Sequence, residues 1–88
     1  MQVTTHPKFK KHYKKRVYPN PKLNKKFKQR FSLFIKNPNH ILLKDHQLKG
    51  KQSPNRAFSI TGDIRVTYHK IDSNHLILLD IGTHNQVY

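Results

Sequence analysis

The sequence predicts an α+β fold in which two helices from the first half of the chain pack on a small antiparallel sheet formed by the second half. Apolar residues recur at helical spacing as far as Ile35, whereas short apolar runs that alternate with polar residues begin at Ala57. Gly, Asn, Asp and Ser residues separate these short runs, as expected for turns between strands. With 88 residues the chain suits one domain with a modest core, which we expect to span residues 1–88.

Two helices are expected on either side of the segment Tyr18-Pro19-Asn20-Pro21, which ends the first and begins the second. Pro7 suits the first turn of a helix on which Phe9 and Tyr13, four residues apart, share one face. In the second helix Asn20 is a good N-cap, and the proline after it is a good first residue. We therefore expect an αα-hairpin with a basic outer surface, preceded by a short edge strand over residues 1–4. The apolar stripe of the second helix consists of Leu23, Phe27, Phe31, Phe34 and Ile35.

An antiparallel meander of three strands is expected over residues 57–61, 65–71 and 76–81, after an irregular segment over 38–56. One register places the large apolar side chains of this meander on a single face. The opposite face is expected to stay open, to carry Ser59, Arg65, Thr67 and Asp80, and to form a site with the segment that follows the last strand. The pairs in this register are Phe58–Tyr68, Ile60–Val66, Val66–Ile81 and Tyr68–Leu79.

The net charge of +14 is concentrated in the first half of the chain. Residues 1–51 hold 15 of the 18 Lys and Arg residues and one acidic residue, whereas residues 52–88 hold three of each kind. Such a charge favours a polyanion, and we expect RNA. A solvated basic face that only keeps the protein soluble is the alternative, and a membrane-surface helix is disfavoured because no broad Leu/Trp face is present. The lysines expected to contact RNA are Lys10, Lys11, Lys14, Lys15, Lys22, Lys25, Lys26, Lys44, Lys49 and Lys51.

The composition argues against several classes of site. The absence of cysteine excludes a disulfide, a thiol nucleophile and thiolate zinc sites. Only four acidic residues are present and none cluster, so neither a paired-carboxylate site nor a metal-dependent nuclease is expected, and no cofactor is expected. The longest apolar runs, 41–43 and 76–79, are too short to span a bilayer, and no hydrophobic signal segment follows Met1. We therefore expect a cytoplasmic protein without a membrane partner.

A ribonuclease site can be assembled from the segment after the last strand. His84 is expected to lie near Arg65, and a His, an Arg and a Tyr within reach of a phosphate can move a proton and stabilise phosphoryl charge. His46 is a second candidate base. Three structural readings remain open: His84 is an ordinary surface histidine, Arg65 forms a salt bridge to Asp80 or Asp63, and His46 is hydrogen-bonded to the aspartate before it.

Three segments together resemble the RelE/ParE toxin superfamily, and most closely its YafQ branch: 44–50 (KDHQLKG), 56–68 (RAFSITGDIRVTY) and 78–88 (LLDIGTHNQVY). The resemblance implies a RelE-like fold and a bacterial type II toxin that is held inactive by an antitoxin protein. Such a toxin enters the ribosomal A site, next to ribosomal RNA, and cleaves mRNA. We expect metal-independent cleavage, in which the ribose 2′-OH attacks its own 3′-phosphate and leaves a 2′,3′-cyclic phosphate and a 5′-OH.

The resemblance also implies roles for single residues. His84 matches the central histidine of the tail motif, His46 the histidine of a "DHPL"-like loop, and Arg65 the arginine that opens an "R-V-x-Y" strand. Asp63 and Tyr88 match an aspartate before a strand and a terminal aromatic residue. Ser59 and Ile64 depart from the YafQ pattern, which has His and Trp there, so the general base is left open between the two histidines. The competing functions are a ParE-like toxin that inhibits DNA gyrase and a non-catalytic RNA- or ribosome-binding protein.

Overall fold

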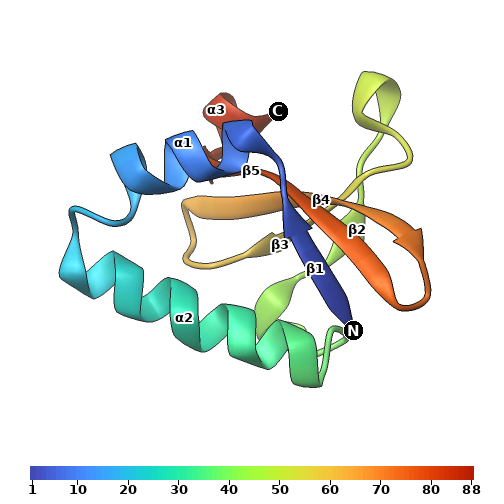
Figure 1. Cartoon of the computed structure of the whole chain (residues 1–88), viewed down its shortest axis with the longest axis horizontal. Coiled ribbons are helices and arrows are strands. Elements are labelled where there is room, and N and C mark those ends of the chain that lie inside the picture. Colours follow the sequence, from blue (N-terminus) through green and yellow to red (C-terminus); the bar gives the residue numbers. More distant parts are fainter.

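The computed structural model describes all 88 residues and confirms the predicted α+β class (Figure 1). Its sheet has five strands rather than three, in the order β1-β5-β4-β3-β2. The expected edge strand forms and pairs in parallel with β5, whereas all other pairs are antiparallel. A short strand that the sequence did not predict adds the opposite edge. The strands are β1 Gln2–Thr5, β2 His46–Gln47, β3 Arg56–Ser59, β4 Ile64–Asp72 and β5 His75–Thr83.

Both predicted helices are present, α1 over Pro7–Arg16 and α2 over Pro21–Lys36. The side chain of Asn20 accepts a hydrogen bond from the backbone N–H of Leu23 at 3.2 Å, as expected of an N-cap. A third helix, α3 (His84–Val87), begins directly after β5, where the sequence suggested only a tail. Two 3₁₀ turns, η1 (Ile41–Leu43) and η2 (Gly50–Gln52), occupy the segment expected to be irregular. No helix of the chain has the length and apolar character needed to cross a membrane.

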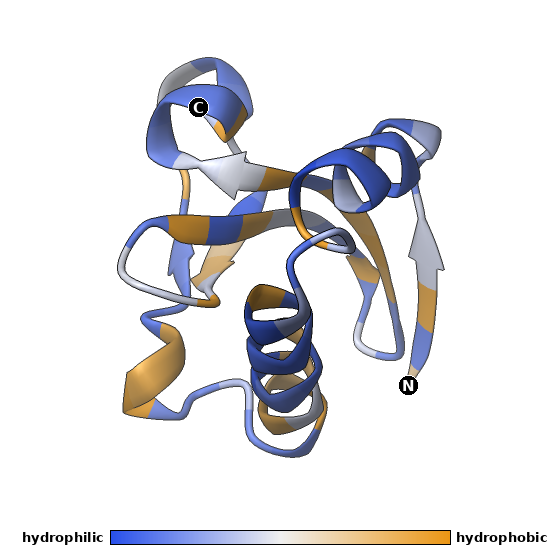
Figure 2. Cartoon of the chain, turned by 90° about the vertical axis from the view of Figure 1, so that its left-hand side faces the viewer, coloured by the Kyte–Doolittle hydropathy of each residue, from blue (hydrophilic) through white to orange (hydrophobic).

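The hydrophobic core lies between α2 and one face of the sheet. Phe34 of α2 stacks on Phe58, with ring centroids 4.2 Å apart, and meets Tyr68 edge-on at 5.0 Å. Figure 2 shows the resulting division: blue hydrophilic positions dominate both long helices, and orange hydrophobic positions recur along the strands. The core cluster consists of Phe9, Val17, Phe27, Phe34, Leu43, Phe58, Ile60, Val66, Tyr68, Leu76, Leu78 and Ile81.

The predicted strand register is wrong by two residues between β3 and β4. Phe58 pairs with Val66 instead of Tyr68. A shift of two residues keeps every side chain on its face, so the apolar pattern could not distinguish the two registers. Between β4 and β5 the Val66–Ile81 pair is confirmed, but an irregularity after Thr67 brings Leu78 opposite Tyr68 in place of Leu79.

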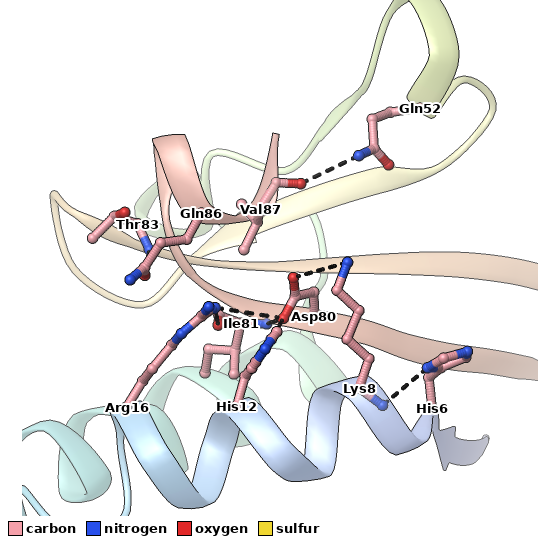
Figure 3. A network of polar contacts seen from close by, with 10 residues as sticks. All are labelled: His6, Lys8, His12, Arg16, Gln52, Asp80, Ile81, Thr83, Gln86 and Val87. Atoms are coloured by element: carbon pink, nitrogen blue, oxygen red, sulfur yellow. Dashed lines mark hydrogen bonds and ion pairs between the residues drawn. The ribbon is translucent and has the colours of Figure 1, made fainter.

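Asp80 does not lie on an open face, because α1 covers it. Its carboxylate belongs to a residue with only 3% of its surface exposed, and the Nδ1 atom of His12 lies 2.6 Å from Oδ1 (Figure 3). Lys8 Nζ is 3.6 Å from Oδ2, and Arg16 Nη1 is 3.7 Å from Oδ1. Arg16 also donates to the carbonyl oxygen of Ile81 at 2.8 Å. The polar face of α1 therefore binds β5 through ion pairs and hydrogen bonds.

The apolar face of α1 turns toward α2 rather than toward the sheet alone. The rings of Phe9 and Tyr13 contact Phe27 at centroid distances of 6.2 and 5.1 Å. The expected αα-hairpin is thus present. Its two helices, however, contact the sheet differently: α2 packs on it through aromatic side chains, and α1 is held to β5 by Asp80.

We expect Asp80→Asn to lower the free energy of unfolding by about 3 kcal/mol, because the cations of α1 would lose the carboxylate that offsets their desolvation. Urea unfolding measures this change. The control is Asp72→Asn in the exposed β4–β5 turn, where the asparagine side chain can still accept from the N–H of Asn74, and its effect is expected to stay within about 0.5 kcal/mol. Equal losses in the two variants would contradict this role of Asp80.

Candidate functional site

Four of the five side chains predicted to act in catalysis meet at one end of the sheet. Arg65 Nη1, on β4, donates to Nδ1 of His84 at 3.1 Å. The ring of Tyr88 meets His84 edge-on, with centroids 4.4 Å apart and an interplanar angle of 84°. His46, on β2, meets the same tyrosine edge-on at 6.5 Å and 86°, and the guanidinium carbon of Arg65 is 6.0 Å from that ring. Tyr88 is therefore the contact that the other three residues share, and we call these four residues the His–Arg–Tyr cluster.

The turn from β5 into α3 carries two members of this cluster to Arg65. Arg65 pairs with Gly82 across the sheet, and His84 follows two residues later. A Cβ atom at Gly82 would lie 2.6 Å from Oε1 of Gln86 and 2.7 Å from Nη1 of Arg16, so a larger residue would displace the ends of these two side chains. Gln86 Oε1 accepts from the backbone N–H of Thr83 at 2.8 Å, which closes a capping box.

The last turn of the chain is also fixed from the far side. Val87 is buried, with 5% of its surface exposed, and its carbonyl oxygen accepts a hydrogen bond from Nε2 of Gln52 at 3.2 Å (Figure 3). Sequence reasoning missed α3 and this contact. The signal for the helix was present, because Thr83 and Gln86 have the spacing of a capping box.

The two histidines of the cluster have opposite hydrogen-bonding roles. A guanidinium can only donate, so Nδ1 of His84 accepts from Arg65, and the neutral ring carries its proton on Nε2. A carbonyl oxygen can only accept, so Nδ1 of His46 donates to the carbonyl of Lys44 at 3.0 Å. The Nε2 atom of neutral His46 is therefore unprotonated and can take a proton. Sequence reasoning named Lys44 only for its charge and missed that its carbonyl fixes this tautomer.

Asp45 does not orient His46, contrary to one structural reading of the sequence. Its two carboxylate oxygens accept from the hydroxyl of Tyr68 at 2.9 and 2.8 Å, and Oδ1 also accepts from Nε of Arg56 at 3.3 Å. Burial raises the pKa of Tyr68, Asp45 raises it further, and Arg56 opposes them. Burial tends to lower the pKa of Arg56, but its contacts with Tyr68 and Asp45 outweigh this and raise it.

The remaining predicted residues are placed as follows. Asp63 is exposed in the β3–β4 turn, where its backbone N–H donates to Oγ1 of Thr61 at 3.2 Å, and no hydrogen bond or ion pair joins it to the cluster. Arg65 makes no salt bridge with either Asp63 or Asp80. Ser59 pairs with Arg65, and Ile64 with Thr83. Nine of the ten lysines expected to contact RNA are exposed, and Lys26 is half-buried.

Burial raises the pKa of Tyr88, and the positive charge of Arg65 opposes this rise. The phenol therefore stays protonated near neutral pH and can donate a hydrogen bond. No three His or Asp side chains of the chain lie close enough together to hold a metal ion. The side chains of the cluster can transfer a proton through imidazole and stabilise charge through a guanidinium.

The fold of this chain is similar to the folds of several solved bacterial toxins. YafQ from Escherichia coli strain BL21(DE3) is 24% identical, with a TM-score of 0.81 over 99% of this chain and 97% of that one. A YoeB/ParE toxin from Agrobacterium tumefaciens is 18% identical, with a TM-score of 0.78 over 96% and 99%. A copper-bound mutant toxin from Helicobacter pylori is 28% identical, with a TM-score of 0.77 over 100% and 99%.

Residues 1–88 match the family described as "Bacterial toxin of type II toxin-antitoxin system, YafQ". The chain therefore belongs to the YafQ family of type II toxins, as the motifs in its sequence suggested. No curated protein matches it significantly in sequence.

The shifted pKa of Tyr68 predicts a loss of stability at high pH. Because its folded-state pKa lies above the ordinary value of 10.0, folding retains a proton that the unfolded chain releases, so this stabilisation is present below about pH 10 and is lost as pH rises toward the folded-state pKa. Urea unfolding between about pH 8 and 11 should show a steeper decline for the native sequence than for Tyr68→Phe, which has no phenol to ionise. Parallel curves would show that Tyr68 titrates alike in both states.

Proposed function

We propose that this toxin is a metal-independent endoribonuclease that acts in the cytoplasm and cleaves mRNA in the ribosomal A site. The observation that carries the proposal is the His–Arg–Tyr cluster, in which two histidines with opposite hydrogen-bonding roles and one arginine converge on Tyr88. Two imidazoles that differ in which nitrogen can accept a proton suit a reaction that needs one base and one acid.

In the proposed reaction His46 is the general base. Its Nε2 takes the proton of the ribose 2′-OH while the 2′ oxygen bonds to the adjacent phosphorus, and the bond from phosphorus to the 5′ oxygen breaks. His84 returns a proton to that 5′ oxygen, so the products are a 2′,3′-cyclic phosphate and a 5′-OH. The same two histidines were the candidates from sequence, and their hydrogen bonds now support one assignment of roles.

Arg65 can donate hydrogen bonds to two acceptors during this reaction, Nδ1 of His84 and the phosphate of the RNA. In the free protein it donates to Nδ1 of His84. When a phosphate arrives, its charge attracts the guanidinium more strongly than a neutral imidazole does, and Nδ1 of His84 is released to take up a second proton. Phosphate binding would thereby both stabilise the developing negative charge and turn His84 into the acid. Tyr88 holds both rings edge-on and keeps a phenolic proton available. Asp63 stays a predicted contributor without a contact to the cluster.

The basic first half of the chain is proposed to hold the ribosome. All but one of the lysines predicted to contact RNA are exposed on α1, α2 and the segment 44–51, where they can neutralise RNA phosphates and release counterions. Such contacts position a protein but do not specify a sequence. A cognate antitoxin is the second proposed partner. A related structure is described as the E. coli DinJ-YafQ toxin-antitoxin complex.

Single-turnover cleavage on programmed ribosomes tests the roles of the histidines. His46→Ala and His84→Ala should each lower the rate by about 10²–10⁴-fold, the usual contribution of a general acid or base. The His46 variant should lose the dependence on pH at the acidic side, because a base must be unprotonated, and the His84 variant should lose it at the alkaline side. His75→Ala, at an exposed hydrogen bond on β5, should cleave at the native rate. If a folded His46→Ala or His84→Ala variant cleaves at the native rate, the role proposed for that histidine is wrong. If instead the His46 variant loses the pH dependence at the alkaline side and the His84 variant loses it at the acidic side, the two roles are reversed.

The second test compares one mRNA with and without ribosomes. A metal-free cluster of four side chains orients an RNA strand poorly by itself, whereas orientation can contribute about 7–11 kcal/mol in the best-aligned cases. We expect cleavage at A-site codons at least about 100-fold faster than cleavage of naked RNA. Binding to ribosomes should weaken steeply with salt. Cleavage should persist when EDTA is added together with enough magnesium to exceed it. Equal rates in the two reactions would make the protein a free-standing ribonuclease, and gyrase-dependent DNA breaks without mRNA breaks would favour the ParE-like alternative.

A further inference from the structure

A pocket of about 380 Å³ adjoins the His–Arg–Tyr cluster and shares Arg65 with it. Its walls come from α2, from the segment η1–Lys44 and from the β3–β4 turn. Four of its nine lining residues are cationic, namely Lys26, Arg30, Lys44 and Arg65, and none is acidic. The proposed reaction uses only Arg65 from this set, so the other three cations are without an assigned role in it.

The cations that line this pocket form no ion pair with an acidic side chain of the protein. The ion pairs of the chain involve Asp80 with α1 and Asp45 with Arg56, and none includes a cation that lines the pocket. Four like charges around one cavity repel one another, and protein walls of low dielectric constant strengthen that repulsion. An anion is therefore the ligand that the electrostatics of the pocket favours.

Arg30 gives a second and independent indication of an anionic ligand. Its Nη1 atom is buried and has no hydrogen-bond partner, although the guanidinium belongs to a residue that is only half-buried. A donor that has left water without gaining an acceptor is destabilising, and such donors are rare in folded proteins. Lys26 precedes it by one helical turn and lines the same pocket. A turn of the Arg30 guanidinium toward the pocket would bring this donor to an oxygen anion held between the two side chains.

The pocket also contains neutral donors. Thr61 Oγ1 accepts hydrogen bonds from the backbone N–H groups of Asp63 at 3.2 Å and Ile64 at 2.9 Å. Both lone pairs of this hydroxyl are thereby used, so its O–H is left to donate. Ser59 also lines the pocket. Guanidinium, ammonium and hydroxyl donors around one cavity suit a tetrahedral oxyanion that accepts several bonds, which is the chemistry of a phosphate.

Two residues border both the pocket and the cluster. Arg65 lines the pocket and donates to His84. Lys44 lines the pocket, and its carbonyl accepts from His46. Its backbone is left-handed, with φ of 49° and ψ of 39°, a conformation that lysine rarely adopts. A ligand that occupies the pocket and the cluster together must carry anionic groups in succession, as the backbone of RNA does.

We propose that this cavity, the flanking-phosphate pocket, binds a phosphodiester next to the one that is cleaved, an inference that rests on the proposed function. The bound phosphate places the neighbouring linkage at Arg65 and the two histidines. None of Lys26, Arg30, Ser59 and Thr61 forms a hydrogen bond with either histidine. We therefore expect the pocket to contribute to the affinity for the RNA strand rather than to proton transfer.

The test measures binding of a 2′-O-methylated RNA trinucleotide, which lacks the attacking hydroxyl and cannot be cleaved. One of its two linkages is replaced at a time by a neutral methylphosphonate. For the native protein, the replacement that falls in the pocket should weaken binding about ten-fold, and the amide resonances of residues 59–62 should no longer shift in NMR titrations. This arm uses no protein variant, so it does not depend on a variant folding.

The protein variant is Lys26→Gln combined with Arg30→Gln. It should bind the all-phosphodiester trinucleotide about ten-fold more weakly than the native protein and should lose the discrimination against methylphosphonate at that linkage. The matched control, Lys28→Gln with Lys36→Gln, removes two exposed lysines from the same helix and should behave like the native protein within about two-fold. A pocket variant that still discriminates as the native protein does would overturn the proposal.

Two further outcomes are decisive. If inorganic phosphate shifts the amides of residues 59–62 at the same concentration as the trinucleotide, the pocket is a general anion site and the proposal is wrong. Because the trinucleotide cannot be cleaved, the binding result is separate from the cleavage assays on ribosomes. Discrimination at one linkage without any cleavage would support the pocket and reject the nuclease, whereas cleavage without discrimination would reject the pocket alone.

Discussion

A carboxylate that is almost wholly removed from water needs polar partners, and Asp80 finds them on α1 in the cations Lys8 and Arg16 and the imidazole of His12. The same contacts decide where other parts of the molecule lie. They hold α1 against β5, and Arg16 reaches on to the carbonyl of Ile81 and to the space beside Gly82. Because the chain turns into α3 at that point, the charge on one buried oxygen pair helps to set the position of His84.

The cluster at the end of the sheet combines a rigid support with exposed reactive groups. Val87 is buried and the Thr83–Gln86 capping box closes the first turn of α3, whereas His84 and His46 themselves are exposed to solvent. A short helix alone would fray, but here its carbonyl is also held by Gln52. Reactive side chains on a fixed base are what a reaction that depends on alignment requires. The hydrogen bonds among Asp45, Tyr68 and Arg56 have a comparable effect near His46, because they fix Asp45, the residue that precedes this histidine.

Local signals in the sequence were reliable where one residue determines the backbone. Asn20 and Pro21 marked the start of α2. Four of the five residues in its predicted apolar stripe lie in the core or against it, but Ile35 is 38% exposed. The predicted approach of His84 to Arg65 is also found, because it required only that β4 and β5 pair near Val66 and Ile81. The exact partners of Phe58 and Tyr68 could not be predicted, since two registers that differ by two residues have the same apolar face. The burial of Asp80 was missed for another reason: alternation along a strand shows which face is polar but not that a helix with cations will cover it.

The parallel pairing of β1 with β5 joins residues 2–5 to residues 75–78. Such a contact closes a loop of nearly the whole chain, and closing this loop costs conformational entropy. The strand pairing that offsets this cost is available only when β5 is in place, so the contact forms late. During synthesis the first 70 residues therefore have no partner for β1, and α1 has no Asp80 to bind. The residues that hold α3 in position come together only after β5 has left the ribosome that makes it. Because Tyr88 is the contact that the other cluster residues share, this topology delays the assembly of the His–Arg–Tyr cluster until residue 88 has been synthesised.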